Sequence, residues 1–217
     1  MSISIVLADD HPLVRRGLRE ALEAEPGFAV VGESGDGLET LRIVEQLEPD
    51  VLVLDLMMPS LNGLDILPLV RQRSPRSRVV VLSMFGNEGM VLQALRNGAV
   101  AYALKGCDSV HAVEAVRRAA AGQRYLGPGI SERAFDAYQG KADAALPDPH
   151  DLLTPRERQV LQLAAEGYAN PDIAARLFIS PRTAEMHRGN ALRKLGLRKQ
   201  ADLIGYAIRR GMIPAVD

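Results

Sequence analysis

The sequence predicts two domains of different fold class: an α/β doubly wound five-stranded parallel sheet, followed by a small all-α domain of four helices that contains a helix-turn-helix. In residues 1–122, five short apolar runs alternate with amphipathic segments, the pattern of a parallel sheet with helices on both faces. From residue 152 the pattern changes to four short helices whose ends are marked by capping residues, glycine or proline. The predicted bounds are 1–122 for the first domain, 123–151 for a linker and 152–217 for the second domain.

The five predicted strands and their helices follow one another along the first domain. The strands are predicted over residues 3–8, 28–31, 51–54, 79–82 and 100–104. The run 51–54 is four continuous apolar residues, which is typical of a strand buried on both faces. Apolar side chains at helical spacing predict helices over residues 12–22, 38–47, 63–70, 91–97 and 110–121.

Composition excludes several classes of protein. The 217 residues contain no run of about 18 uncharged apolar residues, so no membrane span is expected. The N-terminus lacks the basic start of a signal peptide, and the single cysteine, Cys107, excludes an intramolecular disulfide framework. These features favour a cytoplasmic protein, in which Cys107 is an incidental small residue.

The charge is unevenly divided between the two predicted domains. Residues 1–150 hold 15 Lys and Arg against 20 Asp and Glu, whereas residues 151–217 hold 11 against 7. An acidic first part and a basic second part indicate that any polyanionic partner binds the C-terminal domain.

Polar side chains follow four of the predicted strands. Right-handed crossovers make all the strands point the same way, so their carboxyl ends share one edge of the sheet. That edge collects Asp9, Asp10, Asp55, Ser83 and Lys105. Each has an ordinary structural role open to it: Asp10 could cap a helix, Ser83 could end a strand and Lys105 could be solvated. Their convergence instead favours a site, because ligands bind outside the carboxyl ends of strands in open α/β sheets.

The convergent residues suit phosphoryl chemistry. Three carboxylates at close range repel one another and need a counter-ion, and hard oxygen ligands with positions left for water suit Mg²⁺. Lys105 adds a second positive charge, Ser83 adds a hydroxyl, and Asp55 can act as the nucleophile that accepts a phosphoryl group.

The linker and the second domain are marked by turn residues and helix caps. Glycine and proline punctuate residues 123–151, where one short helix over 131–138 is the only regular element expected. Thr154, Pro155 and Glu157 predict a capping box at the start of a helix. Further helices are predicted from Asn170, over 182–195 and over 200–210, and the tight turn at 177–181 indicates a helix-turn-helix.

The spacing of these motifs resembles that of NarL/FixJ-type response regulators over nearly the whole chain. Asp9-Asp10, Asp55 to Pro59 and the later Ser83 and Lys105 look like a receiver domain, and residues 152–212 resemble the LuxR-type DNA-binding domain. The resemblance implies that Asp55 is the phospho-acceptor and that the pair of acids holds Mg²⁺ with it. It further implies that Ser83 and Lys105 contact the phosphoryl group and that Tyr102 is an aromatic switch, although an ordinary strand aromatic is the alternative for Tyr102.

Three departures from the family pattern bear on these expectations. Gly106 stands where many receivers have proline, Asn170-Pro171-Asp172 replaces Asn-Lys-Glu, and Ala184 replaces a valine. Pro171 fits only in the first turn of its helix.

The predicted helix 182–195 is the recognition helix that this resemblance implies. A helix of this kind enters the major groove of double-stranded DNA, with cations on phosphates and other side chains at base edges. Ala184, Ala191, Leu192 and Leu195 are expected to pack inward. The expected DNA contacts are Arg182, Thr183, Glu185, Met186, His187, Arg188, Gly189, Arg193, Lys194, Arg198 and Lys199.

The favoured hypothesis is a phosphorylation-switched transcription regulator rather than an enzyme. A sensor histidine kinase would phosphorylate Asp55, and the protein would form a homodimer on phosphorylation or DNA binding, with residues 203–210 as a plausible dimer contact. One alternative is a haloacid-dehalogenase-like phosphatase, but Met57 stands where that class has its general acid. The other is a DNA-binding protein with a vestigial receiver that ignores phosphorylation.

Overall fold

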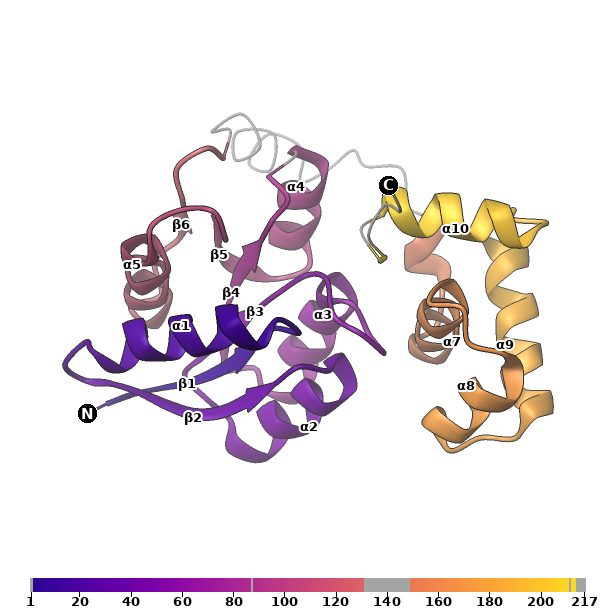
Figure 1. Ribbon diagram of the computed structural model, residues 1–217, viewed down its shortest axis with the longest axis horizontal. Helices are drawn as coiled ribbons and strands as arrows, with labels where there is room; N and C mark the ends of the chain where they lie inside the picture. The colour runs from indigo at the N-terminus through magenta and orange to yellow at the C-terminus, as the bar shows by residue number, and fades with distance from the viewer. Residues whose placement is uncertain (1, 87, 131–148, 211, 214–217) are drawn as a thin grey trace.

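The computed structural model describes residues 2–86, 88–130, 149–210 and 212–213, and they form two domains (Figure 1). The N-terminal domain is a parallel sheet with helices on both faces. The C-terminal domain is a small bundle of helices beside it. The predicted helix over 131–138 lies outside the described residues.

The sheet of the N-terminal domain has six parallel strands in the order β2-β1-β3-β4-β5-β6. The change of direction in this order at β1 and β3 is the switch point at which α/β sheets place their sites. The strands are β1 (Ile3–Ala8), β2 (Phe28–Ser34), β3 (Val51–Leu54), β4 (Arg78–Ser83), β5 (Ala99–Leu104) and β6 (Tyr125–Leu126).

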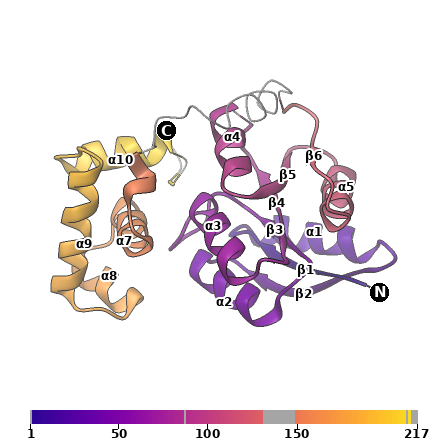
Figure 2. The same ribbon diagram turned by 180° about the vertical axis from the view of Figure 1, so that it is seen from behind.

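Two helices cover one face of this sheet and three cover the other (Figures 1 and 2). The helices are α1 (Pro12–Glu23), α2 (Gly37–Leu47), α3 (Gly63–Arg73), α4 (Glu88–Arg96) and α5 (Ser109–Ala120). Strand β3 shows the division: Val51 and Val53 pack in the core with α1 and α5, whereas Leu52 and Leu54 pack in the core with α2, α3 and α4. Burial on both faces explains why this strand is uniformly apolar.

The sequence predicted the five main strands and their order along the chain. The differences lie at the ends of elements and at the edge strands of the sheet. Strand β2 runs on to Ser34, three residues beyond its predicted end, because an edge strand tolerates the polar Gly32-Glu33-Ser34 that ends the apolar run. Helix α4 begins at Glu88, before its first predicted residue. Strand β6 lies within the predicted linker and pairs with β5 through only two residues, too few for any pattern to show.

The C-terminal domain contains the four predicted helices. They are α7 (Pro155–Ala165), α8 (Asn170–Leu177), α9 (Pro181–Lys194) and α10 (Gln200–Arg209), preceded by the short 3₁₀ helix η1 (Pro149–Leu152). The predicted capping box is present, with Thr154 N donating to Glu157 (2.8 Å) and Glu157 N donating to Thr154 Oγ1 (3.3 Å). Pro171 lies in the first turn of α8, as its sequence position required.

Helix α9 packs through small side chains. Ala184 and Ala191 are fully buried in a core shared with α7, α8 and α10, and Leu192 and Leu195 are partly buried against that core. The inward face predicted for this helix is therefore confirmed, and its opposite face is exposed at the surface of the domain. Among the helices that the structure describes, none combines the length and apolar character that crossing a bilayer requires.

Candidate functional site

The ends of strands β1, β3, β4 and β5 bring the predicted pocket residues to one edge of the sheet. Asp9 and Asp55 follow β1 and β3 and are each 2% exposed, and Ser83 ends β4 fully buried. Lys105 follows β5, and its Nζ lies 2.7 Å from Asp9 Oδ2 and 2.7 Å from Asp55 Oδ2. Asp10 lies beside them on the exposed rim. The five residues predicted to converge are thus brought together.

Burial and charge act against each other on Asp55. Burial raises the pKa of the Asp55 carboxyl to about 6, because the charged form loses water. The positive charge of Lys105 and its hydrogen bond lower this pKa, Asp9 raises it, and the Met57 backbone N–H lowers it. Burial also acts to lower the pKa of Lys105, but Asp55 and Asp9 outweigh it and the pKa of Lys105 is raised. The charged form of Lys105 is therefore stabilised in the pocket, whereas at Asp55 burial outweighs the effect of the lysine.

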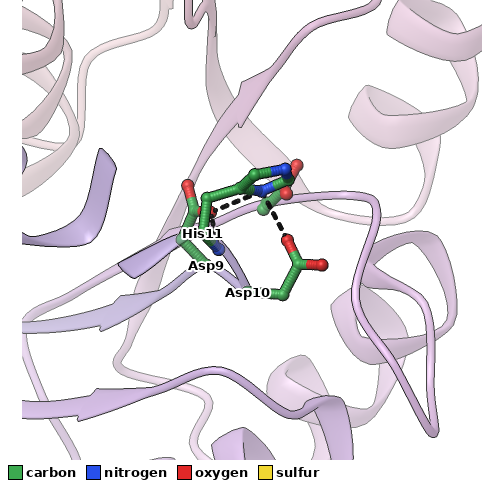
Figure 3. Close-up of side chains that lie close together, drawn as sticks. Asp9, Asp10 and His11 are labelled. Carbon is green, nitrogen blue, oxygen red and sulfur yellow. Dashed lines mark hydrogen bonds and ion pairs between the residues drawn. The ribbon is translucent and has the colours of Figure 1, made fainter. Parts of the chain in front are cut away.

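His11 belongs to the same cluster and was not predicted as a site residue. Its Nδ1 lies 2.7 Å from Asp10 Oδ1 and 3.3 Å from Asp9 Oδ1, and its backbone N–H donates to Asp9 Oδ1 at 2.9 Å (Figure 3). One ligand atom each from Asp9, Asp10, His11 and Asp55 lies within 4.8 Å of the others, a group that could hold a metal ion. The sequence showed His11 only as the residue before a helix-starting proline, and its adjacency to two acids was the available signal.

The loop after Asp55 is held close to it by glycine. A Cβ on Gly63 would collide with the Asp55 carbonyl oxygen, and Gly63 N donates to Leu56 O at 2.8 Å, closing the loop. Asn62 caps α3 by accepting from Asp65 N at 3.1 Å. The backbone from Asp55 to α3 is thus closed into a short hydrogen-bonded loop.

Ser83 and Tyr102 are linked through the segment after β4. Phe85 N donates to Ser83 Oγ at 3.2 Å, and the Tyr102 hydroxyl donates to Phe85 O at 2.5 Å. Tyr102 is fully buried on the α4 side of the sheet. Burial raises its pKa to about 12, with Ser83 lowering it and Asp55 raising it. The geometry connects Tyr102 to the pocket edge, and its switching role stays a prediction.

A second candidate surface lies on α9. Its N-cap residue is Ser180, whose Oγ accepts from Thr183 N at 3.0 Å. The five residues predicted for its outer face, Arg182, Glu185, Met186, Gly189 and Arg193, are all exposed. The surface is hollowed beside its first turns, where Asn170, Pro171 and Thr183 join Arg182, Glu185 and Met186. Arg182, Glu185 and Met186 place a cation, an acid and an apolar side chain at an exposed helix end. Such a set of side chains can contact base edges in a groove of DNA.

Several of the predicted DNA contacts are already engaged within the C-terminal domain, including Arg193, which donates to Asn190 Oδ1 at 2.5 Å. Lys194 Nζ lies 2.7 Å from Glu157 Oε2 and donates to Leu152 O at 3.0 Å, so this lysine ties α9 to the start of α7. Arg188 donates to Asn170 Oδ1 at 3.2 Å and to Gln200 Oε1 at 2.6 Å. His187 and Thr183 are half-buried, whereas Arg198 and Lys199 are exposed at the start of α10.

Both domains match known families. The response regulator receiver domain family matches residues 5–117, and the luxR family of bacterial regulatory proteins matches residues 151–207. The chain is a two-component response regulator. The transcriptional regulatory protein MctR of Rhizobium johnstonii is 38% identical to it over 214 residues, which cover 99% of this chain and 97% of MctR.

Solved structures share the fold of this response regulator. A two-component response regulator of the LuxR family from Aurantimonas sp. has a TM-score of 0.59 at 33% identity, covering 63% of this chain and 97% of that one. RcsB from Salmonella enterica serovar Typhimurium, bound to promoter P1flhDC in the presence of the phosphomimetic BeF3-, has a TM-score of 0.57 at 26% identity, covering 95% and 98%. The response regulator therefore has a receiver domain and a LuxR-type DNA-binding domain, as its sequence predicted, and is related to transcription regulators.

Proposed function

We propose that Asp55 of this response regulator accepts a phosphoryl group from a sensor histidine kinase and that the phosphorylated protein binds double-stranded DNA as a homodimer to regulate transcription. The observation that carries this is the buried Asp55 carboxylate, ion-paired through one oxygen to Lys105 at 2.7 Å. We assign the role of nucleophile to this carboxylate. Above a pH of about 6 the carboxylate is ionised, as nucleophilic attack requires.

The transfer needs no reactant other than the kinase's phosphohistidine and a proton from water. An Asp55 oxygen attacks phosphorus of the kinase's phosphohistidine, a P–O bond forms as the P–N bond breaks, and the imidazole leaves and takes up a proton. Lys105 is ion-paired with Asp9 and Asp55 before the transfer. Afterwards its ammonium can turn toward the new phosphoryl oxygens. Ser83 lies at the same edge and is expected to donate to them.

The acidic cluster fits Mg²⁺. Asp9, Asp10 and Asp55 would hold the ion, because they offer hard carboxylate oxygens within 4.8 Å of one another. When bound, Mg²⁺ neutralises charge on the transferring phosphoryl oxygens. The acids Asp9, Asp10 and Asp55 outnumber Lys105 at this edge of the sheet, so the charge balance favours such a cation.

The proposed response passes through Ser83 and Tyr102 to the C-terminal domain. A phosphoryl group that draws Ser83 would disturb the Phe85 backbone, to which Tyr102 is bonded. We expect Arg182, Glu185 and Met186 to lie at bases and Arg193, Arg198 and Lys199 at phosphates, with the remaining predicted contacts positioning α9. A protein that acts on chromosomal DNA acts in the cytoplasm of a bacterium. RcsB, which is solved with promoter DNA and a phosphomimetic, supports this proposal.

We do not expect turnover chemistry from the pocket. Met57 occupies the position two residues after Asp55, where aspartate phosphatases carry a second acid, and methionine cannot protonate a leaving group. Steady hydrolysis of a small phosphate ester by the purified protein would favour the phosphatase hypothesis instead.

The test is phosphoryl labelling of the full-length protein by acetyl phosphate or a kinase. Wild type should label once, and Asp55→Asn should not label. Asp172→Asn, an exposed acid in α8, is the matched control and should label as wild type does. Full labelling of Asp55→Asn at another residue would refute the assignment.

A further inference from the structure

His11 is placed beside the acidic pocket by its backbone, and its side chain has no part in the helix that follows. It is the N-cap residue of α1 and has an extended backbone, yet its side chain makes no capping hydrogen bond. Its backbone N–H donates to Asp9 Oδ1 at 2.9 Å, and Pro12 begins the helix behind it. The local structure therefore fixes where the imidazole lies without using the ring itself.

The imidazole faces two acids. Its Nδ1 lies 2.7 Å from Asp10 Oδ1 and 3.3 Å from Asp9 Oδ1 (Figure 3). The side chain of His11 is 61% exposed, whereas that of Asp9 is 3% exposed. The ring therefore lies on the solvent side of a buried carboxylate, at the entrance to the pocket.

The two oxygens of Asp9 face different groups. Oδ2 lies 2.7 Å from the Nζ of Lys105, which is paired with Asp55 Oδ2 as well. Oδ1 is the oxygen on the His11 side. The oxygen that Lys105 neutralises is thus not the one that faces the imidazole, and Asp10 adds a second carboxylate on the His11 side.

The spacing of these groups suits a single ion. One ligand atom each from Asp9, Asp10, His11 and Asp55 lies within 4.8 Å of the others, and the part of the chain that the structure describes has one such group. Two ligands on opposite sides of a bound divalent ion lie roughly 4.2 Å apart, which is twice a metal–ligand distance of about 2.1 Å. Small side-chain rotations are therefore enough to close the four atoms around an ion.

A nitrogen ligand changes which ion the pocket suits. Mg²⁺ takes oxygen ligands and keeps several of its waters, so it gains little from an imidazole. Imidazole is instead a good ligand for divalent transition ions from Fe²⁺ to Zn²⁺. The neutral ring has a lone pair on one of its two nitrogens, and Nδ1 is the nitrogen that faces the acids.

We propose that His11 Nδ1 is a fourth ligand in the pocket of Asp9, Asp10 and Asp55, and that it shifts the preference of this pocket from Mg²⁺ toward divalent transition ions. The inference rests on the proposed function in one respect, that the acidic cluster binds a divalent ion. It adds the nitrogen ligand and the choice of ion. The competing role for the ring is to orient Asp10 by a hydrogen bond, which would support every divalent ion alike.

The first test compares Co²⁺ with Mg²⁺ by isothermal titration calorimetry on metal-free, full-length protein without an added histidine tag. His11→Asn removes the imidazole but keeps a short side chain that can donate to Asp10. It should weaken Co²⁺ binding roughly tenfold or more, since even outer-shell partners of a metal site have effects of this size. Mg²⁺ binding should stay within about twofold of wild type, because a water can replace the ring on that ion.

The matched control is His111→Asn in α5. His111 is a histidine of the same domain whose Nδ1 lies 2.8 Å from the Tyr125 hydroxyl, and the variant should bind both ions as wild type does. Equal weakening of Co²⁺ and Mg²⁺ by His11→Asn, or no weakening of either, would overturn the nitrogen ligand and leave the proposed Mg²⁺ site standing. Wild type that binds neither ion would overturn both.

X-ray absorption at the cobalt edge gives a second readout that does not depend on a variant. Wild type loaded with one equivalent of Co²⁺ should show the outer-shell scattering of a coordinated imidazole, and so should His111→Asn. The scattering should be absent from His11→Asn. An oxygen-only coordination shell in the wild type would overturn the proposal.

Discussion

The pocket around Asp55 and the outer face of α9 are the two functional regions of this response regulator, and they are built in opposite ways. The pocket gathers buried groups from the ends of four strands, and its charges are paired to within 2.7 Å. The α9 face presents exposed side chains from one helix, and its cations either extend into solvent or are engaged within the domain. The fold alone fixes the geometry of the buried pocket, whereas the exposed side chains of α9 need a bound partner to fix theirs. The two regions should therefore fail differently when a single cation is removed.

The largest effect is expected from removing the pocket cation. Lys105→Met leaves Asp9 and Asp55 facing each other without a counter-charge, which should lower the free energy of unfolding by roughly 3 kcal/mol at pH 8 in EDTA. Urea unfolding of the full-length protein measures it. Lys199→Met removes an exposed lysine and should stay within about 0.5 kcal/mol of wild type. Equal stabilities for the two variants would mean that the pocket is not held by its charges.

The next effect concerns the acid and depends on pH. The pKa of Asp55 is raised to about 6 in the folded protein, so its contribution to stability is present below about pH 4 and is lost as pH rises through 6. Asp55→Asn cannot ionise and should therefore be more stable than wild type by roughly 1–3 kcal/mol at pH 8 in EDTA, with the difference shrinking toward pH 4. Urea unfolding across this range measures it, and a difference independent of pH would contradict the raised pKa.

A smaller effect is expected at the exposed surface, and on DNA affinity alone. Arg182→Ala should weaken DNA binding about tenfold and reduce the salt dependence by about one charge, because it removes one base contact and one cation from the DNA-facing surface. Fluorescence anisotropy titrations at several salt concentrations measure both. The urea midpoint should not move, since Arg182 is exposed. Undiminished affinity would place the DNA elsewhere on the domain.

The smallest effect distinguishes Lys194 from Arg182. Because Lys194, whose side chain is 33% exposed, is ion-paired with the buried Glu157, Lys194→Met should lower the free energy of unfolding by about 1 kcal/mol and leave the salt dependence of DNA binding unchanged. A salt dependence reduced as strongly as in Arg182→Ala would show that Lys194 leaves Glu157 to bind phosphate.

Most of the pocket was predictable because strand direction decides it. Once the strands are parallel, Asp9, Asp55 and Lys105 must share an edge, and local apolar runs suffice to find the strands. His11 was missed because its contact depends on a side-chain rotamer at a helix start. Strand β6 was missed because two residues carry no periodicity.

The contact between the domains had no local signal at all. Asp65 has the sequence context of an acid in the first turn of a helix, where exposure is the rule, and its partner His150 lies 85 residues further along the chain. Helix α9 was predicted with its buried face, but Arg188 and Lys194 were counted as free cations. Their partners Asn170 and Glu157 come from other helices, and only the packing of the domain brings them within reach.

The most direct measurement is DNA affinity at one fixed salt concentration for the full-length protein with and without phosphorylation. Wild type should bind a target duplex more tightly once phosphorylated, and Asp55→Asn should bind with one unchanged affinity under both conditions. Equal affinities for phosphorylated and unphosphorylated wild type, in protein shown to carry the phosphoryl group on Asp55, would contradict the link between the buried pocket and the exposed helix.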